Sequence, residues 1–394
     1  MLNRRKSLSD RLLNPNFGGQ FLSRCLRTKS SRGYGGNVCR KSKAGKHGEH
    51  DGEEEGRIRL LKSRGQHLLT NQRVLDSIVR TSDIKPDDTV LEIGPGTGNL
   101  TLKLLEAARK VVAVEIDNRM VEILRKRAAE RGFQDRLNIV SGDALKTKFP
   151  EFNLVVANIP YGISSPLLAK LVYGVNVNPF RSATLLLQKE FARRLLAKPG
   201  DSEFNRLAVN MKLVAEVEFV MDVSKRDFVP CPKVDSSVIK IYPKSEIPDV
   251  DLEEWWAFTR TCFSKKNKTL GATFKQKRKL MELVKLSKAE VFSKDVNLES
   301  HDDGSNSDGD EECESDEGSC DSSLSSGTGI GFLRTKIVRI LESGGFLEKR
   351  PSKLSNDELL QLLSLLNGAG IYFHDRTKQK DACEAAFAAC DDLL

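Results

Sequence analysis

The sequence lacks the features of a membrane protein, a secreted disulfide-bonded protein or a zinc protein. No apolar run approaches the roughly 18 residues that a membrane-spanning helix needs. The eight cysteines are scattered, with no Cys-x-x-Cys pair and no Cys/His set at zinc-ligand spacing. We therefore expect a reducing compartment, no metal and no membrane partner.

Acidic residues are also few outside one segment. The chain of 394 residues has a formal net charge of +8 and an isoelectric point near 9.0. Residues 299–326 hold eleven Asp and Glu and no Lys or Arg, so the remaining residues carry +19 between them. This balance favours an anionic partner such as nucleic acid. The length allows two or three domains, and an apolar content of 39% supports a sizeable core.

The first 48 residues are basic and almost free of acids, with twelve Lys and Arg and one acid, Asp10. Such an Arg-rich, Ser-rich composition is typical of an organelle transit peptide, and the lack of a continuous apolar stretch argues against a secretory signal. A disordered basic arm that touches RNA or directs nuclear import is the alternative. We assign residues 1–56 to this arm and expect a mitochondrial protein, with a plastid or the nucleolus as alternatives.

Apolar strands alternate with amphipathic helices between residues 57 and 246. The expected strands are 89–93, 111–115, 137–140, 154–157, 183–187, 217–223 and 236–242. The expected helices are 100–108, 119–131, 166–172 and 189–197. Alternation of this kind predicts an α/β fold with a doubly wound, mostly parallel seven-stranded sheet, closed by the last two strands as an antiparallel pair.

A small helical domain is predicted over residues 247–373. Helical periodicity covers 251–285 and 332–370, and Ser355 and Glu358 supply capping chemistry at the start of the last clear helix. The acidic segment 299–329 between these pieces cannot bury a core, so we expect a disordered insert. Residues 374–394 form a C-terminal extension for which we predict no structure.

A glycine-rich loop, with Gly94, Gly96 and Gly98, follows the first strand and opens a helix. Glycines allow a tight turn and let a ligand approach the backbone. A dinucleotide fingerprint would need a further glycine at position 99, which is Asn. The loop therefore favours a nucleoside ligand without a pyrophosphate.

Two acids follow the next two strands. Glu115 ends the second strand, where it is placed to accept hydrogen bonds from both ribose hydroxyls. Asp143 follows the third strand and can accept a hydrogen bond from an adenine amino group. Each acid alone would also suit a solvated strand end or a helix cap. Glycine loop, Glu115, Asp143 and Asn158 follow strands one to four in turn, which is the order of an S-adenosylmethionine site.

The tetrapeptide Asn158-Ile159-Pro160-Tyr161 lies at the carboxyl end of the fourth strand, where open α/β sheets bind ligands. The Asn158 side-chain carbonyl and the backbone carbonyl of Ile159 or Pro160 can accept hydrogen bonds from the two N–H groups of an exocyclic amine. The Tyr161 ring can lie flat against the base. The alternative is an ordinary strand-to-loop turn with Tyr161 as a wall residue.

Together these motifs resemble the ribosomal RNA adenine N6-dimethyltransferase family, and its eukaryotic branch in particular, over residues 64–373 apart from the insert. The segment 65–69 is similar to the family motif that closes over the cofactor, which implies cofactor contacts for His67 and Leu69. Residues 228–236 resemble its FxPxPxVxS element, which implies that Phe228 packs against the target base. Phe228 as a plain core residue is the alternative.

The resemblance implies S-adenosyl-L-methionine as cofactor and dimethylation of adenosine N6 in small-subunit ribosomal RNA, by a monomer that acts during ribosome biogenesis. The implied catalytic residues are Asn158, Pro160, Tyr161 and Phe228. The implied cofactor-binding residues are His67, Leu69, Gly94, Gly96, Gly98, Glu115, Asp143 and Asn158. Basic runs at 193–194, 265–268 and 275–279 are expected to line an RNA track.

Two other functions remain open from the sequence. The first is an RNA- or DNA-binding ribosome-assembly or mitochondrial transcription factor that keeps the fold without depending on catalysis. The second is an adenine methyltransferase that acts on DNA. The intact tetrapeptide 158–161 favours an enzyme, because a binding module needs no amide aimed at an amine.

Overall fold

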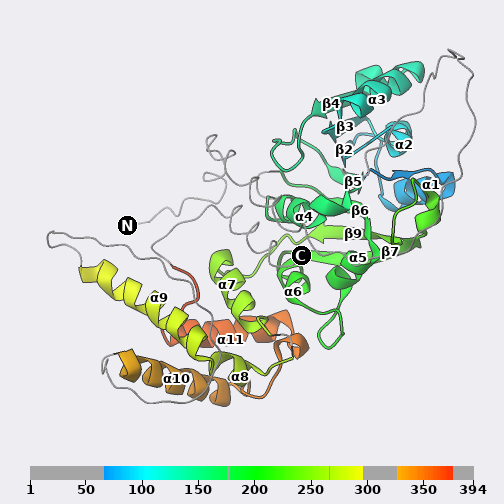
Figure 1. The fold of residues 1–394 in the computed structure, drawn as a ribbon. Coiled ribbons are helices and arrows are strands. Elements are labelled where there is room, and N and C mark those ends of the chain that lie inside the picture. Colours follow the sequence, from blue (N-terminus) through cyan, green and yellow to red (C-terminus); the bar gives the residue numbers. More distant parts are fainter. Residues whose placement is uncertain (1–65, 175–177, 266, 296–325, 376–394) are drawn as a thin grey trace, which may run out of the picture.

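A seven-stranded sheet lies at the centre of the α/β part of the molecule (Figure 1). The computed structural model describes residues 66–174, 178–265, 267–295 and 326–375. For residues 287–295 and 326–328 it describes the backbone alone. The strand order is β4-β3-β2-β5-β6-β9-β7. The strands are β2 (Thr89–Ile93), β3 (Lys110–Glu115), β4 (Leu137–Ser141), β5 (Leu154–Asn158), β6 (Ser182–Gln188), β7 (Ala215–Val223) and β9 (Ser236–Pro243).

The sheet is parallel from β4 to β6, and β9 runs antiparallel between β6 and β7. The predicted doubly wound fold and its antiparallel closing pair are therefore confirmed. The first strand of the sheet, β2, lies between β3 and β5, so the order of connection reverses there. Ligands of open α/β sheets bind at such a reversal, outside the carboxyl ends of the strands.

Successive residues of the parallel strands face two different cores, because side chains alternate across a strand. Val90 and Val111 pack with α1 and α2, whereas Leu91 and Val112 pack with α4, α5, α6 and the helical domain. The helices of this part are α1 (Gln72–Thr81), α2 (Asn99–Ala107), α3 (Asn118–Glu130), α4 (Ser164–Tyr173), α5 (Lys189–Leu196) and α6 (Arg206–Val214).

Five helices form the second part of the molecule, below the sheet in Figure 1. They are α7 (Leu252–Cys262), α8 (Leu270–Phe274), α9 (Lys277–Asp295), α10 (Ser326–Ser343) and α11 (Asn356–Gly368). Ser355 and Glu358 form the predicted capping box at the start of α11. The domain is tied to the sheet side through Trp256, whose ring lies edge-on to Tyr173 at 4.9 Å between centroids. No helix in the described ranges has the length and apolarity to cross a bilayer.

Some sequence expectations need correction. Helices α1 and α6 and the two-stranded sheet of β1 (Leu68–Leu69) and β8 (Phe228–Val229) were not predicted. Helix α10 begins at Ser326, so the predicted insert was four residues too long at its C-terminal end. The Ser and Gly residues there are weak helix formers, which hid the start of the helix. The arm 1–56, most of the insert and most of the C-terminal extension lie outside the described residues.

Candidate active site

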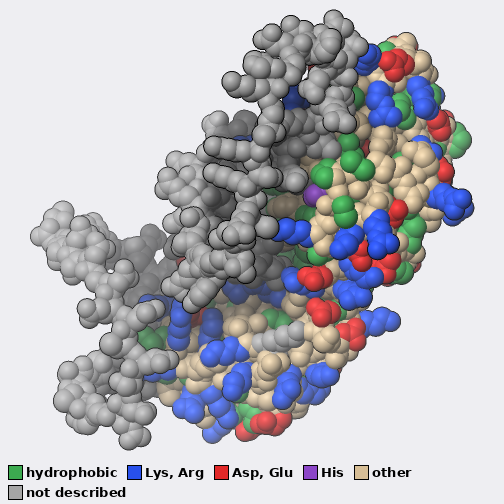
Figure 2. Space-filling model, turned by 45° about the vertical axis from the view of Figure 1, so that its right-hand side comes forward, with side chains coloured by type: hydrophobic (Ala, Val, Ile, Leu, Met, Phe, Trp, Pro, Cys, Tyr) green, Lys and Arg blue, Asp and Glu red, His purple; other side chains and the backbone are tan. Residues whose placement is uncertain are grey.

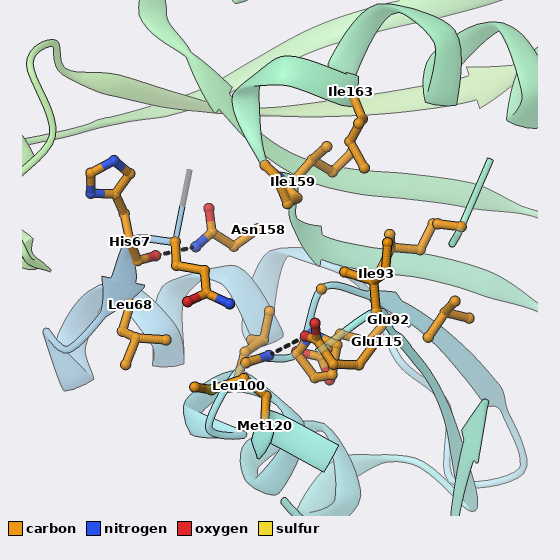
Figure 3. A pocket seen from close by; sticks show the side chains of 18 of the residues that line it. His67, Leu68, Glu92, Ile93, Leu100, Glu115, Met120, Asn158, Ile159 and Ile163 are labelled. Carbon is orange, nitrogen blue, oxygen red and sulfur yellow. Dashed lines mark hydrogen bonds between the residues drawn. The ribbon is translucent and has the colours of Figure 1, made fainter. Parts of the chain in front are cut away.

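A cavity of about 820 Å³ opens at the carboxyl ends of β2, β3, β4 and β5 (Figure 3). It is lined by the segments after these strands and by residues 66–69 of the N-terminal loop and β1. The structure thus brings together nearly all predicted site residues, the exceptions being Gly98 and Phe228. Those that line the cavity are His67, Leu69, Gly94, Gly96, Glu115, Asp143, Asn158, Pro160 and Tyr161.

The glycine loop forms one wall of the cavity, and its backbone excludes other residues. Gly96 has a φ of +56°, and a Cβ there would lie 2.8 Å from the Leu68 Cδ2 atom. A Cβ on Gly94, at φ +68°, would meet the Pro160 ring at 3.3 Å. Gly98 instead packs against Leu124 of α3 at the start of α2. With a φ of +87° it shapes the turn into α2, and its predicted contact with a cofactor stays a prediction.

Glu115 is buried at the end of β3 and is fixed by two backbone donors. Its Oε2 accepts from the Gly96 N–H at 3.1 Å, and its Oε1 accepts from the Asp117 N–H at 2.9 Å. Burial raises the pKa of Glu115, and the backbone donors offset part of that effect. The carboxylate is held rigidly beside the glycine loop, with acceptor capacity left for ribose hydroxyls.

Asp143 lies in the loop after β4 and lines the same cavity. Its Oδ1 accepts from the Leu145 N–H at 2.9 Å, which leaves Oδ2 for a ligand. The Lys170 ammonium donates to the Ala144 carbonyl at 2.7 Å and so holds this loop against α4. These bonds hold Asp143 in place at the cavity, and its predicted hydrogen bond to an adenine amino group stays a prediction.

Sequence reasoning missed three further residues of the cavity. Ile116 lines it with 57% of its surface exposed, an apolar face for a flat ring. Its signal was an apolar residue directly after Glu115. Asn99, noted only as a missing glycine, donates from Nδ2 to the Leu69 carbonyl at 2.9 Å and ties β1 to α2.

The third missed residue is Glu92, at the end of β2 directly before the glycine loop. It lines the cavity, and its Oε2 is buried without a hydrogen-bond partner. Burial raises the pKa of this carboxyl to about 8. A buried carboxyl at a cavity wall suits a cationic ligand, because a nearby positive charge favours its ionised form. Within the described residues, no cluster of three or more His, Cys, Asp or Glu could hold a metal ion.

Asn158 points its amide toward the N-terminal loop (Figure 3). Its Nδ2 donates to the His67 backbone carbonyl at 3.2 Å. A carbonyl only accepts, so the amide nitrogen must face His67, and Oδ1 remains for another donor. The Pro160 carbonyl already accepts from the Ile163 N–H at 3.1 Å, which favours Ile159 as the backbone acceptor for an amine.

Tyr161 and Phe228 have different surroundings. The Tyr161 hydroxyl lies 2.8 Å from the buried Ser236 Oγ, and burial raises the pKa of the phenol. Phe228 is 3% exposed and packs in the core with α1, because β8 pairs with β1 and places it opposite Leu69. Phe228 does not line the cavity and its burial favours the core alternative, whereas its contact with a target base stays a prediction.

This arrangement defines a class of enzyme. A seven-stranded sheet with one antiparallel strand, a glycine loop after its first strand and acids after the next two form a methyltransferase that uses S-adenosyl-L-methionine. The cavity residues fit this cofactor, since three acidic residues, Glu92, Glu115 and Asp143, line the cavity and could accept hydrogen bonds from its hydroxyl and amino groups or balance its positive charge. Residues Glu92, Glu115, Ile116 and Asp143 would hold it.

Comparison with known proteins identifies the family. The sequence model named Ribosomal RNA adenine dimethylase matches residues 58–303. The mitochondrial ribosomal RNA small subunit methyltransferase of Arabidopsis thaliana is 64% identical over 329 residues, which cover 84% of this chain and 83% of that protein. A probable dimethyladenosine transferase of Dictyostelium discoideum is 42% identical over 316 residues, covering 80% and 91% of the two chains.

A solved structure agrees with the sequence relatives. The crystal structure of a dimethyladenosine transferase from Plasmodium falciparum matches with a TM-score of 0.63 at 38% identity, and covers 78% of this chain and all of that chain. The chain therefore belongs to the ribosomal RNA adenine dimethylase family.

Proposed function

We propose that this protein transfers methyl groups from S-adenosyl-L-methionine to N6 of adenosines in small-subunit ribosomal RNA, and so takes part in ribosome biogenesis. One observation carries the proposal beyond family membership. The Asn158 amide is fixed by the His67 carbonyl with its oxygen free, beside a cavity that suits the cofactor. A protein that only binds RNA has no need for such an acceptor.

The chemistry divides between the cofactor and the chain. When bound, S-adenosyl-L-methionine supplies a methyl group on a sulfonium, which is already a strong electrophile. The adenine N6 lone pair is delocalised into the ring and attacks poorly. Asn158 Oδ1 and the Ile159 carbonyl accept hydrogen bonds from the two N6–H groups, which favours a more tetrahedral nitrogen with a localised lone pair. No general base is needed, because the proton can leave after transfer.

Positioning then supplies most of the acceleration, and well-oriented groups can contribute up to about 7–11 kcal/mol. The target base must leave its stack to reach the cavity. Tyr161, fixed through its hydroxyl, is the residue we propose to stack on it. Such stacking is worth about 1–3 kcal/mol per base and offsets much of the unstacking cost.

Basic side chains outside the cavity are proposed to contact RNA phosphates. Lys and Arg side chains are frequent over the helical domain in the lower part of Figure 2. Lys277, Arg278 and Lys285 of α9 border one shallow depression together with Met281 and Glu282. Phosphate contacts of this kind give affinity and register, whereas the cavity selects the base.

The protein is proposed to act as a monomer in mitochondria. The basic, acid-poor residues 1–48 and the name of the Arabidopsis relative support this compartment. A fluorescent fusion of residues 1–60 tests it: co-localisation with a mitochondrial dye supports the proposal, and a plastid or nucleolar signal contradicts it.

The function is tested by offering radiolabelled S-adenosyl-L-methionine with small ribosomal subunits that lack the modification, with free RNA or with duplex DNA. Label in dimethyladenosine of small-subunit RNA supports the proposal. Label in duplex DNA, or binding of subunits without any label, would support one of the alternative functions instead.

A further inference from the structure

His67 connects three segments around the base side of the cavity. Its backbone carbonyl accepts from Asn158 Nδ2 at 3.2 Å. Its ring Nδ1 lies 2.8 Å from the Pro230 carbonyl, in the loop after β8. Its ring also stacks with Tyr161, at 6.1 Å between centroids and 28° between planes. One residue thus contacts the amide, the aromatic wall and the loop after β8.

The hydrogen bonds fix the chemical state of these groups. The Pro230 carbonyl can only accept, so Nδ1 of His67 carries the proton. The Asn158 amide nitrogen is likewise fixed on the carbonyl of residue 67, so its oxygen faces the amine. An amide turned by 180° would present N–H groups to the N–H groups of the substrate, and no hydrogen bond would form.

The position of the His67 carbonyl therefore decides which way the acceptor points. The carbonyl belongs to a loop segment just before the two-residue strand β1, which pairs only with β8. The tether from the His67 ring to Pro230 adds a second attachment to the same loop. Thr70, which follows β1, makes a separate attachment to the residue before β8: its Oγ1 donates to the Asp227 carbonyl at 3.1 Å. This bond lies on the far side of β1 from Asn158.

We propose that His67 is a positioning residue for methyl transfer: its ring, tethered to Pro230 and stacked with Tyr161, holds its own carbonyl where it orients the Asn158 amide. This inference rests on the proposed function and changes the role expected for His67 from cofactor contact to alignment of the acceptor. Loss of the ring should then slow the methyl-transfer step and leave cofactor affinity nearly unchanged.

Three variants separate the parts of this role. His67→Ala removes ring and tether, His67→Phe keeps a stacking ring without the donor, and His67→Asn keeps an N–H close to the Nδ1 position. A misplaced reacting group can cost about 100-fold in rate, so we expect about 10- to 100-fold slower single-turnover transfer in His67→Ala and His67→Phe. His67→Asn should recover most of this loss. Thr70→Val, which removes a bond between the other end of β1 and the residue before β8 without touching the amide, is the matched control and should behave as wild type.

Two readouts decide the outcome. Calorimetry should give S-adenosyl-L-methionine affinities for all variants within about threefold of wild type, as expected when an interaction acts only in the transition state. Wild-type rates in His67→Ala, or a loss of affinity as large as the loss of rate, would overturn the proposal. A loss of affinity as large as the loss of rate would instead support direct contact between His67 and the cofactor.

The other readout does not depend on activity. In protein labelled with ¹⁵N-asparagine, the Asn158 side-chain NH2 resonance is assigned by its absence from an Asn158→Ala spectrum. It should shift and exchange faster with solvent in His67→Ala, and return toward wild type in His67→Asn. An unchanged resonance would overturn the inference even if no RNA substrate were methylated, whereas a failure of the proposed function alone would leave this shift intact.

Discussion

The two halves of the cavity are built in different ways. The cofactor half consists of the glycine loop, Glu92, Glu115, Ile116 and Asp143, which lie at or just after the carboxyl ends of the parallel strands β2, β3 and β4. The base half consists of residues 158–161 with His67 and Ser236, and its contacts join segments that are 75 to 94 residues apart. The first half depends on backbone donors close in sequence or on adjacent strands, and the second on side-chain contacts between loops.

This difference separates affinity from reactivity. Glu115 is held by backbone N–H groups of the glycine loop and of the residue two positions after it, so its position does not depend on any other side chain. The Asn158 amide keeps its position only while residue 67 does. Changes in the cofactor half should therefore act on binding of S-adenosyl-L-methionine, and changes in the base half on the rate of transfer.

The largest effect is expected for Asn158→Ala. Loss of one preorganised hydrogen-bonding group at a reacting centre costs about 100- to 1,000-fold in rate, and we expect a loss of this size in single-turnover transfer. Binding of S-adenosyl-L-methionine, measured by calorimetry, should remain within about threefold. Near-normal turnover would remove the division between the halves, because the base half would then lack its acceptor.

Glu115→Ala should produce the opposite pattern. Hydrogen bonds to a charged group contribute about 1.5–3 kcal/mol, so cofactor affinity should fall by roughly 10- to 100-fold. The rate at saturating cofactor should change much less. Thermal unfolding is measured in parallel, because the Gly96 and Asp117 N–H groups lose their acceptor. Unchanged affinity in a folded variant would contradict the ribose assignment.

Glu92→Gln tests the electrostatics of the cofactor half without substrate. The unfolded carboxyl ionises near its ordinary pKa of 4.5, whereas the folded one has a pKa of about 8. The folded wild type thus holds the extra proton between these values, and its stability falls as pH rises through this window. The glutamine variant has no ionisable group here, so its stability relative to wild type should rise by about 3–4 kcal/mol from pH 5 to pH 8. Denaturant unfolding at both pH values checks this, and parallel profiles would contradict it.

The smallest effect is expected outside both halves. Replacing Lys277 and Arg278 of α9 with Glu should weaken RNA binding several-fold and lower the slope of log affinity against log salt by about one for each lost phosphate contact. Replacing Arg125 and Lys126, two exposed residues of α3, with Glu is the control with the same change of net charge. Equal losses in both variants would show a general charge effect rather than a contact surface.

The sequence allowed the cofactor half to be predicted because its signals are local. A glycine loop after an apolar strand, and an acid at the end of the next strand, define positions that the parallel sheet brings together without further information. The strands β2, β3, β5 and β6 were predicted for a similar reason, since buried strands of a parallel sheet are continuous apolar runs.

The base half could be predicted only as a set of residues. Nothing local to Asn158 shows that its amide nitrogen meets residue 67, and nothing near Phe228 shows that pairing of β8 with β1 buries its ring. Glu92 was missed because an acid before a glycine loop has no visible partner in the sequence. These contacts depend on tertiary packing, which spacing along the chain does not encode in a readable form.

The central claim is that the Asn158 side-chain oxygen faces the reacting amine. A crystal structure with sinefungin, whose amine marks the place of the transferred methyl group, tests it most directly. The account predicts Asn158 Nδ2 on the His67 carbonyl and Oδ1 on the side of the ligand amine. An amide turned away from the ligand and buried in packing would contradict it.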